Sequence, residues 1–305
     1  MLKKYQIIDG RLGEVTTDDA PVSVYVNPSE AEKNYLVNGL LLDEHTMNSS
    51  LDPDELGRLE FEANHIAVIF KKPRRYTSVD NFLFKVSSVG IFLFNDRMIL
   101  VAEEDFLFEG RLFTKLRSVQ DVFFKVIFSF IRHFEEHLLI IHKVSDELEI
   151  EINKSMSNKS LINMFNLEKS LVYYLNAITS NGKTIEKLKL NTVRIGFPQE
   201  AGEFLEDVII ENAQCYEQAN TYSQVLSSLM DARASIVSNN LNIRIKMLTI
   251  LSICIMMPTF IVSLFSMNMP LPLPHATTLV PFSIVLSLAG LSVVTILIVW
   301  RIRRW

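Results

Sequence analysis

The chain has 305 residues, of which 49% are hydrophobic and 21% charged, and its formal net charge at pH 7 is −5. The acidic balance argues against nucleic acid as a partner, and Cys215 and Cys254 lie far apart in different kinds of segment, so a disulfide framework is not indicated. Residues 1–5 lack the apolar core of a signal peptide, so the N-terminal region is expected to stay in the cytoplasm.

Residues 1–104 are predicted to form a cytoplasmic α/β domain. Apolar runs of strand type alternate there with charged stretches of helical type. The predicted strands are 22–26, 66–70, 89–94 and 98–101, with a hairpin turn at 95–97. Helices are predicted over 29–41 and 51–59, the second opened by Asp52 as a cap and Pro53 in the first turn.

Residues 105–200 are predicted to be the helical part of the cytoplasmic region. Two long amphipathic stretches, 119–154 and 158–179, have the period of a helix. Phe197-Pro198 then breaks the chain, because proline cannot continue a helix.

Two polar motifs in these regions have a functional and a structural interpretation. His133 and His137 lie one helical turn apart, a spacing that suits zinc, but such pairs are usually surface or packing residues. The basic run at 71–75 could suggest nucleic acid or anionic lipid, but in an acidic protein we interpret it as a solvated turn.

Residues 201–246 are predicted to form a long stalk helix. The sequence has no proline from 201 to 257, no glycine after Gly202, and an apolar repeat near 3.5 residues. The helix is therefore expected to continue into the membrane, with a length of roughly 80 Å at about 1.5 Å per residue. A helix of this length favours self-association into a bundle.

The C-terminal end is predicted to cross a membrane twice. No Lys, Arg, Asp or Glu occurs from 247 to 300. Segments 247–267 and 279–300 are each long enough to span about 30 Å of hydrocarbon, and the proline-rich segment 268–278 between them is predicted to be an external loop. Basic residues flank both spans, including the tail 301–305, so the positive-inside rule places both termini in the cytoplasm.

One face of the first span carries a stripe of small polar side chains among apolar ones. Its residues recur every three or four positions, with a last step of five: Asn242, Ile245, Leu248, Ser252, Met256, Thr259, Ser263 and Asn268. A polar stripe in a membrane must face protein or water. Periodicity alone does not decide between helix packing and a pore lined by several copies.

The span ends in Ser266-Met267-Asn268, and with this tail the chain resembles the CorA family of divalent-cation transporters. That family has two C-terminal membrane helices, the first closing with Gly-Met-Asn. The resemblance covers essentially the whole chain. Similar residues stand at 238–240, 246–250, 259–261, 51–56 and 58–60.

The resemblance implies a funnel-shaped homopentamer in the plasma membrane (the inner membrane of a bacterial cell), in which the first span lines a central pore for Mg²⁺. Asn242, Ile245, Leu248, Ser252, Met256, Thr259 and Ser263 are then pore-lining, and Ser266, Met267 and Asn268 form the signature that selects the ion. Asp231 matches an acidic ring near the cytoplasmic entrance. Asp207, with Asp80 as its candidate partner, matches a regulatory Mg²⁺ site between subunits.

Two departures from the family pattern keep alternatives open. Ser266 replaces the signature glycine, and the external loop lacks acidic residues. The alternatives are a transporter of Zn²⁺, Co²⁺ or Ni²⁺, and a non-conducting, membrane-anchored sensor or scaffold with the same fold. No catalytic set is visible, so an enzyme is not expected; the expected partners are further copies of the chain, divalent ions and lipid.

Overall fold

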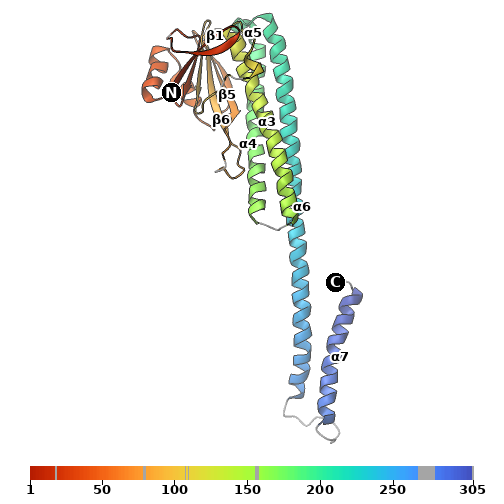
Figure 1. Ribbon diagram of the computed structural model, residues 1–305. Helices are drawn as coiled ribbons and strands as arrows, with labels where there is room; N and C mark the ends of the chain where they lie inside the picture. The colour runs from red at the N-terminus through yellow and green to blue at the C-terminus, as the bar shows by residue number, and fades with distance from the viewer. Residues whose placement is uncertain are drawn as a thin grey trace. The chain divides into compact units, whose positions relative to one another are not determined.

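The computed structural model describes residues 1–17, 19–77, 80–106, 108, 110–154, 158–266 and 279–303. The chain divides into two compact units, Met1–Met230 and Asp231–Trp305 (Figure 1). The division falls inside the predicted stalk helix, and each unit is described by itself.

The first unit is built on a seven-stranded sheet with the order β2-β1-β3-β7-β6-β5-β4. The strands are β1 Leu2–Ile8, β2 Arg11–Val15, β3 Val22–Val26, β4 Arg58–Phe61, β5 Ile66–Pro73, β6 Val86–Leu93 and β7 Met98–Ala102. The β3–β7 pair is parallel, with Val24 opposite Leu100, and the other neighbours are antiparallel. β1 and β2 form a hairpin that turns at Asp9-Gly10, both with positive φ.

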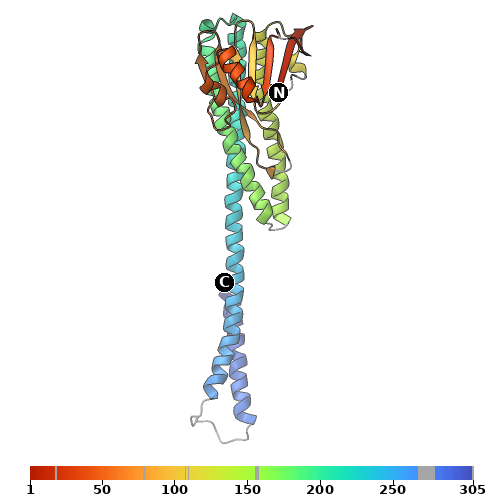
Figure 2. The same ribbon diagram turned by 90° about the vertical axis from the view of Figure 1, so that its left-hand side faces the viewer.

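Helices cover both faces of this sheet (Figures 1 and 2). Short elements follow β3, and long helices follow β7. They are α1 Glu30–Asn34, the π-helix η1 Tyr35–Gly39, α2 Glu44–Ser49, the 3₁₀ turn η3 Arg111–Phe113, α3 Val119–Lys154, α4 Asn158–Leu190, α5 Thr192–Ile195, α6 Gln199–Phe265 and α7 Leu279–Arg303. Helix α6 begins in the first unit and continues into the second.

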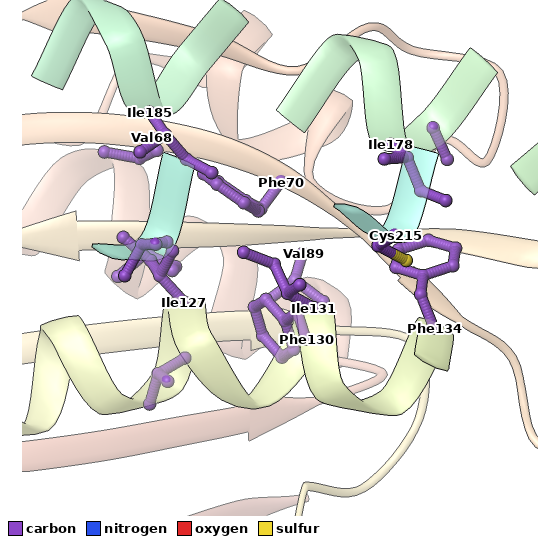
Figure 3. Close-up of a cluster of buried hydrophobic side chains, with 14 of the residues drawn as sticks. Val68, Phe70, Val89, Ile127, Phe130, Ile131, Phe134, Ile178, Ile185 and Cys215 are labelled. Carbon is purple, nitrogen blue, oxygen red and sulfur yellow. The ribbon is translucent and has the colours of Figure 1, made fainter. Parts of the chain in front are cut away.

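Alternation along the central strands divides the core between the two faces of the sheet. Val68 and Phe70 of β5 belong to the larger cluster, which also holds α3, α4 and the first part of α6. Figure 3 shows Phe130 of α3 and Ile178 of α4 in this cluster, together with Cys215 of α6. Successive side chains of a strand point to opposite faces, and residues such as Ala67 join the smaller cluster under η1 and α2. Burial on both faces explains why these strands are continuous apolar runs in the sequence.

The predicted helix over 51–59 is wrong. The helix lies earlier, at α2, where the Asp43 side chain accepts a hydrogen bond from the Thr46 N–H at 2.8 Å. Asp52 does not cap a helix, because its carboxylate accepts from the N–H of Asp54 at 2.9 Å and closes a turn. Residues 58–61 then form β4 against β5.

The interpretation of the basic run at 71–75 as a solvated turn is wrong for its first half. Lys71 and Lys72 lie on β5, and each is only 4% exposed. The Lys71 ammonium donates to the Pro53 carbonyl at 2.7 Å and to the Ser88 hydroxyl at 2.9 Å. Burial lowers the pKa of both lysines.

Candidate ion pathway on helix α6

The predicted pore stripe lies on the exposed surface of α6 in the second unit. All seven of its described members are exposed: Asn242, Ile245, Leu248, Ser252, Met256, Thr259 and Ser263. Leu248 and Met256 are 63% and 67% exposed, and apolar residues of the same span outside the stripe, such as Ile255 at 63%, are equally exposed. An apolar surface of this extent is covered by lipid or by further protein.

Helix α7 packs against another face of α6 (Figure 1). Between Leu241 and Ser266, the partly buried positions on α6 recur every three or four residues and are Ile250, Cys254, Pro258, Ile261 and Phe265. On α7 the covered positions centre on Ala289, which is 8% exposed, and Ile296. The two helices run antiparallel, since one groove between them is lined by residues from the start of the α6 span and from the end of α7. These residues are Ile245, Lys246, Thr249, Ile250 and Ile253 of α6, and Ile296, Val299 and Trp300 of α7.

The face of α6 that meets α7 lies nearly opposite the predicted pore stripe. Each residue turns a helix by about 100°, so positions 250, 254, 258, 261 and 265 point away from 248, 252, 256, 259 and 263. Ile245 is the stripe member that borders the groove with α7. Helix α7 therefore leaves the rest of the described stripe free. This arrangement is the one needed for α6 to line a shared axis with α7 outside it.

Two hydroxyl groups of the stripe donate within α6 and so present acceptors outward. Thr259 donates its hydroxyl proton to the carbonyl of Ile255 at 2.7 Å, and Ser252 donates to the carbonyl of Leu248 at 2.9 Å. A hydroxyl that donates within its own helix keeps its oxygen lone pairs free to accept. Water bound to a cation turns its hydrogens outward, so this stripe suits the hydration shell of a cation.

Length and composition also fit a membrane location for this unit. Helices α6 and α7 each contain a segment long and apolar enough to cross a bilayer. No residue in the apolar window of α6 is buried in the chain, unlike the core helix of a soluble protein.

Comparison with known proteins decides the family. Residues 24–304 match the family described as CorA-like Mg²⁺ transporter protein. The chain belongs to this family. A cobalt/magnesium transport protein CorA from Methanocaldococcus jannaschii is 21% identical over 316 residues, covering 99% of this chain and 97% of that protein. A CorA protein from Thermotoga maritima is 22% identical over 174 residues, covering 56% of this chain and 49% of that protein.

Solved structures share the fold. The complete structure of the M. jannaschii CorA magnesium transporter has a TM-score of 0.79 at 20% identity and covers 98% of this chain and 96% of that one. The full-length CmaX protein has a TM-score of 0.73 at 14% identity and covers 99% and 97%. The predicted class, an α/β domain followed by long helices and two C-terminal helices, is confirmed, while the pentamer stays a prediction.

The CorA-like signature is only partly within the described residues. Ser266 directly follows α6, and its N–H donates to the carbonyl of Val262 at 3.1 Å. Its φ is not positive, so serine in place of glycine is not strained at this position. Met267 and Asn268 lie outside the described residues, as does the whole of the predicted external loop, 268–278.

The acidic residues assigned from the CorA resemblance occupy different surroundings. Asp231 and Asp207 are exposed on α6. The carboxylate of Asp80 accepts from the Thr77 N–H at 2.8 Å and the Thr77 hydroxyl at 2.6 Å, which lowers its pKa, and lies 3.8 Å from the Lys85 ammonium. Across the described part of the chain, no group of three or more His, Cys, Asp or Glu could hold a metal. A regulatory site between copies needs the assembly to complete it.

His137 is buried and His133 is partly buried, and the two rings are in contact. Their rings lie 4.5 Å apart, and Nδ1 of His137 is 2.6 Å from the hydroxyl of Tyr174. Burial lowers the pKa of each histidine to about 4. Both rings are therefore neutral at physiological pH.

Proposed function

We propose that this chain is one subunit of a homopentameric membrane channel that passes Mg²⁺ along the α6 stripe. The CorA-like family to which it belongs transports Mg²⁺, and a transporter needs no catalytic set. The observation that carries the proposal is the orientation of α6: its acceptor-bearing face points away from α7. Both termini would lie in the cytoplasm, following the basic flanks.

Mg²⁺ would cross with much of its hydration shell in place. This ion dehydrates reluctantly and needs near-octahedral coordination. Rings of neutral oxygens from Asn242, Thr259 and Asn268 would hydrogen-bond its waters strongly enough for entry and weakly enough for exit. Leu248 and Met256 would form apolar constrictions that close the pore by dewetting, and a ring of Asp231 would concentrate cations at the inner end.

Removal of the Thr259 hydroxyl tests the stripe directly. Thr259→Val keeps the shape of the side chain and removes one acceptor per subunit. We expect Mg²⁺ flux into liposomes, followed with a Mg²⁺-sensitive dye, to fall about 5-fold, the equivalent of about 1 kcal/mol for one hydrogen bond.

Thr295→Val is the matched control for this variant. Thr295 lies on α7, is exposed, and donates its hydroxyl to the Leu291 carbonyl at 2.8 Å, as Thr259 does within α6. Flux should be unchanged in this variant. Equal loss in both variants would contradict a pore lined by the α6 stripe. Wild-type flux of Zn²⁺, Co²⁺ or Ni²⁺ but not Mg²⁺ would favour the alternative ions, and no flux at all would favour a scaffold.

The second part of the proposal is that internal Mg²⁺ regulates the channel. Acidic side chains at subunit contacts repel one another unless a cation bridges them, so Mg²⁺ bound at Asp207, with Asp80 as its candidate partner, would favour a symmetric closed state. We expect Asp207→Asn to raise several-fold the internal Mg²⁺ concentration needed to inhibit flux.

The matched control for Asp207→Asn is Glu217→Gln, which removes one charge from another exposed position on α6. Flux measured against a series of internal Mg²⁺ concentrations distinguishes the two variants. Unchanged inhibition in Asp207→Asn would refute the regulatory role and leave the pore itself untouched.

A further inference from the structure

A pocket of about 660 Å³ opens in the first unit, and none of its lining residues is assigned to transport. It lies between the end of β5, the segment that follows β7, and the first half of α3. Its size falls in the range occupied by small ligands. Its basic side chains come from three separate parts of the chain: Lys72, Arg75, Arg111 and Arg132.

The charges of this pocket do not cancel within the chain. Asp105 lines the pocket, but its carboxylate is paired with Lys3 at 2.6 Å. The Lys72 ammonium lies 3.6 Å from Glu104. Among the described residues, no ion pair involves the guanidinium groups of Arg75, Arg111 or Arg132. Besides Asp105, the acidic residue among the described lining residues is Glu136. An acidic protein therefore keeps a local excess of positive charge at one concave site.

His133 indicates that these charges converge on one place. The pKa of its imidazole is lowered to about 4. Burial is the largest cause, and the positive charges of Lys72 and Arg75 contribute less. The ring is therefore neutral at physiological pH, and it can donate or accept a hydrogen bond without adding charge.

The wall beside the arginines is aromatic. Phe106 is partly exposed, and its ring centroid lies 5.6 Å from that of Phe130 and 6.1 Å from that of Phe113. A partly exposed phenyl ring supported by two buried rings offers a rigid apolar surface for a planar group.

From the unpaired guanidinium groups beside an aromatic wall, we propose that this pocket binds a phosphate-bearing anion of nucleotide size. Arg75, Arg111 and Arg132 hold the phosphates, because the guanidinium fork matches phosphate oxygens in pairs. Phe106 contacts the base. The proposal does not depend on the transport function. Binding at this site is measured without any flux assay, so the two proposals can fail separately.

The same chemistry gives a dependence on Mg²⁺. Mg²⁺ binds the phosphates of nucleotides and removes part of their negative charge. A site made of fixed positive charges therefore binds the Mg²⁺-free anion more tightly than its Mg²⁺ complex.

Calorimetry on the full-length protein in detergent tests the proposal, with ATP as the probe, EDTA present and low salt. We expect saturable binding of one ATP per chain, weaker binding of inorganic triphosphate, and none of adenosine. Arg132→Gln and Arg111→Gln should each weaken ATP binding about 10-fold or more, as expected for loss of a charged hydrogen-bonding partner. Excess Mg²⁺ should weaken it as well.

Arg11→Gln is the matched control, because Arg11 is an exposed arginine on β2 that does not line the pocket. It should leave ATP affinity unchanged. The proposal is overturned by any of three results: no saturable ATP binding at millimolar concentrations, equal weakening by Arg11→Gln and Arg132→Gln, or adenosine binding as tight as that of ATP. Because the variants change exposed side chains, far-ultraviolet circular dichroism should be identical for all of them.

Discussion

Asn268→Ala is expected to lower Mg²⁺ uptake about 10- to 100-fold, the equivalent of the 1.5–3 kcal/mol that a hydrogen bond to a charged group contributes. Asn268 follows Phe265, the last residue of α6, by three positions and stands last in the Ser-Met-Asn signature. In the proposed assembly its amide oxygens form the first ring that the hydrated ion meets. Loss of that ring removes acceptors at the point where the ion enters the pore.

The control for this variant is Asn239→Ala, which removes the same amide from an exposed position on α6 outside the stripe. Uptake should stay near the wild-type rate in this control. Both variants should be reconstituted at equal density, checked by the amount of protein per liposome. Wild-type uptake by Asn268→Ala would remove Asn268 from the ion's path.

Gly90→Ala is expected to destabilise the first unit by about 2–3 kcal/mol, the range for overpacking a dense core. A Cβ at Gly90 on β6 would lie 1.9 Å from Oγ and 2.6 Å from Cβ of Ser50, where real contacts are longer than 3 Å. Ser50 cannot withdraw easily, because it is fully buried and its hydroxyl donates to the Thr46 carbonyl at 2.9 Å. The thermal midpoint, followed by circular dichroism, should fall by about 5–10 °C for a unit of this size.

Gly202→Ala is the control substitution, since a Cβ there meets no atom within 4 Å. It lies inside α6, where alanine is favoured over glycine by about 0.5–1 kcal/mol, so the midpoint should rise or stay unchanged. Combining Gly90→Ala with Ser50→Gly moves the small residue to the other side of the contact and should recover part of the loss. A midpoint unchanged by Gly90→Ala would contradict the close contact between β6 and α2.

Residues that are buried on both faces of the sheet are the part of the fold most readily predicted from sequence. The predicted strand at 22–26 coincides with β3, and the predicted helix at 119–154 coincides with α3. β1 and β2 were not predicted, because each has one polar face and lacks a continuous apolar run. The signal that could have identified them is Asp9-Gly10, a dipeptide typical of a two-residue hairpin turn.

Local signals misled where long-range contacts decide the structure. Asp52-Pro53 is typical of a helix start, yet pairing of residues 58–61 with β5 makes that segment a strand. Lys71 resembles a surface lysine, yet Pro53 and Ser88, distant in sequence, supply acceptors that allow its burial.

The candidate pore stripe is predictable from period alone, since its members lie on one helix. The face of α6 covered by α7 is not, because contacts such as those around Ala289 join segments separated by the signature and the loop. The basic pocket was also missed. Arg75, Arg111 and Arg132 come from three segments with no common spacing, so only the tertiary structure brings them to one cavity.

The most direct test of the whole account is an electron-microscopy map of the protein in lipid nanodiscs at a resolution that resolves side chains. Five copies should surround one axis, with Asn242, Thr259 and Asn268 pointing toward it and α7 on the lipid side of α6. A map with α7 nearest the axis, with Thr259 facing lipid, or without any central opening would contradict the account.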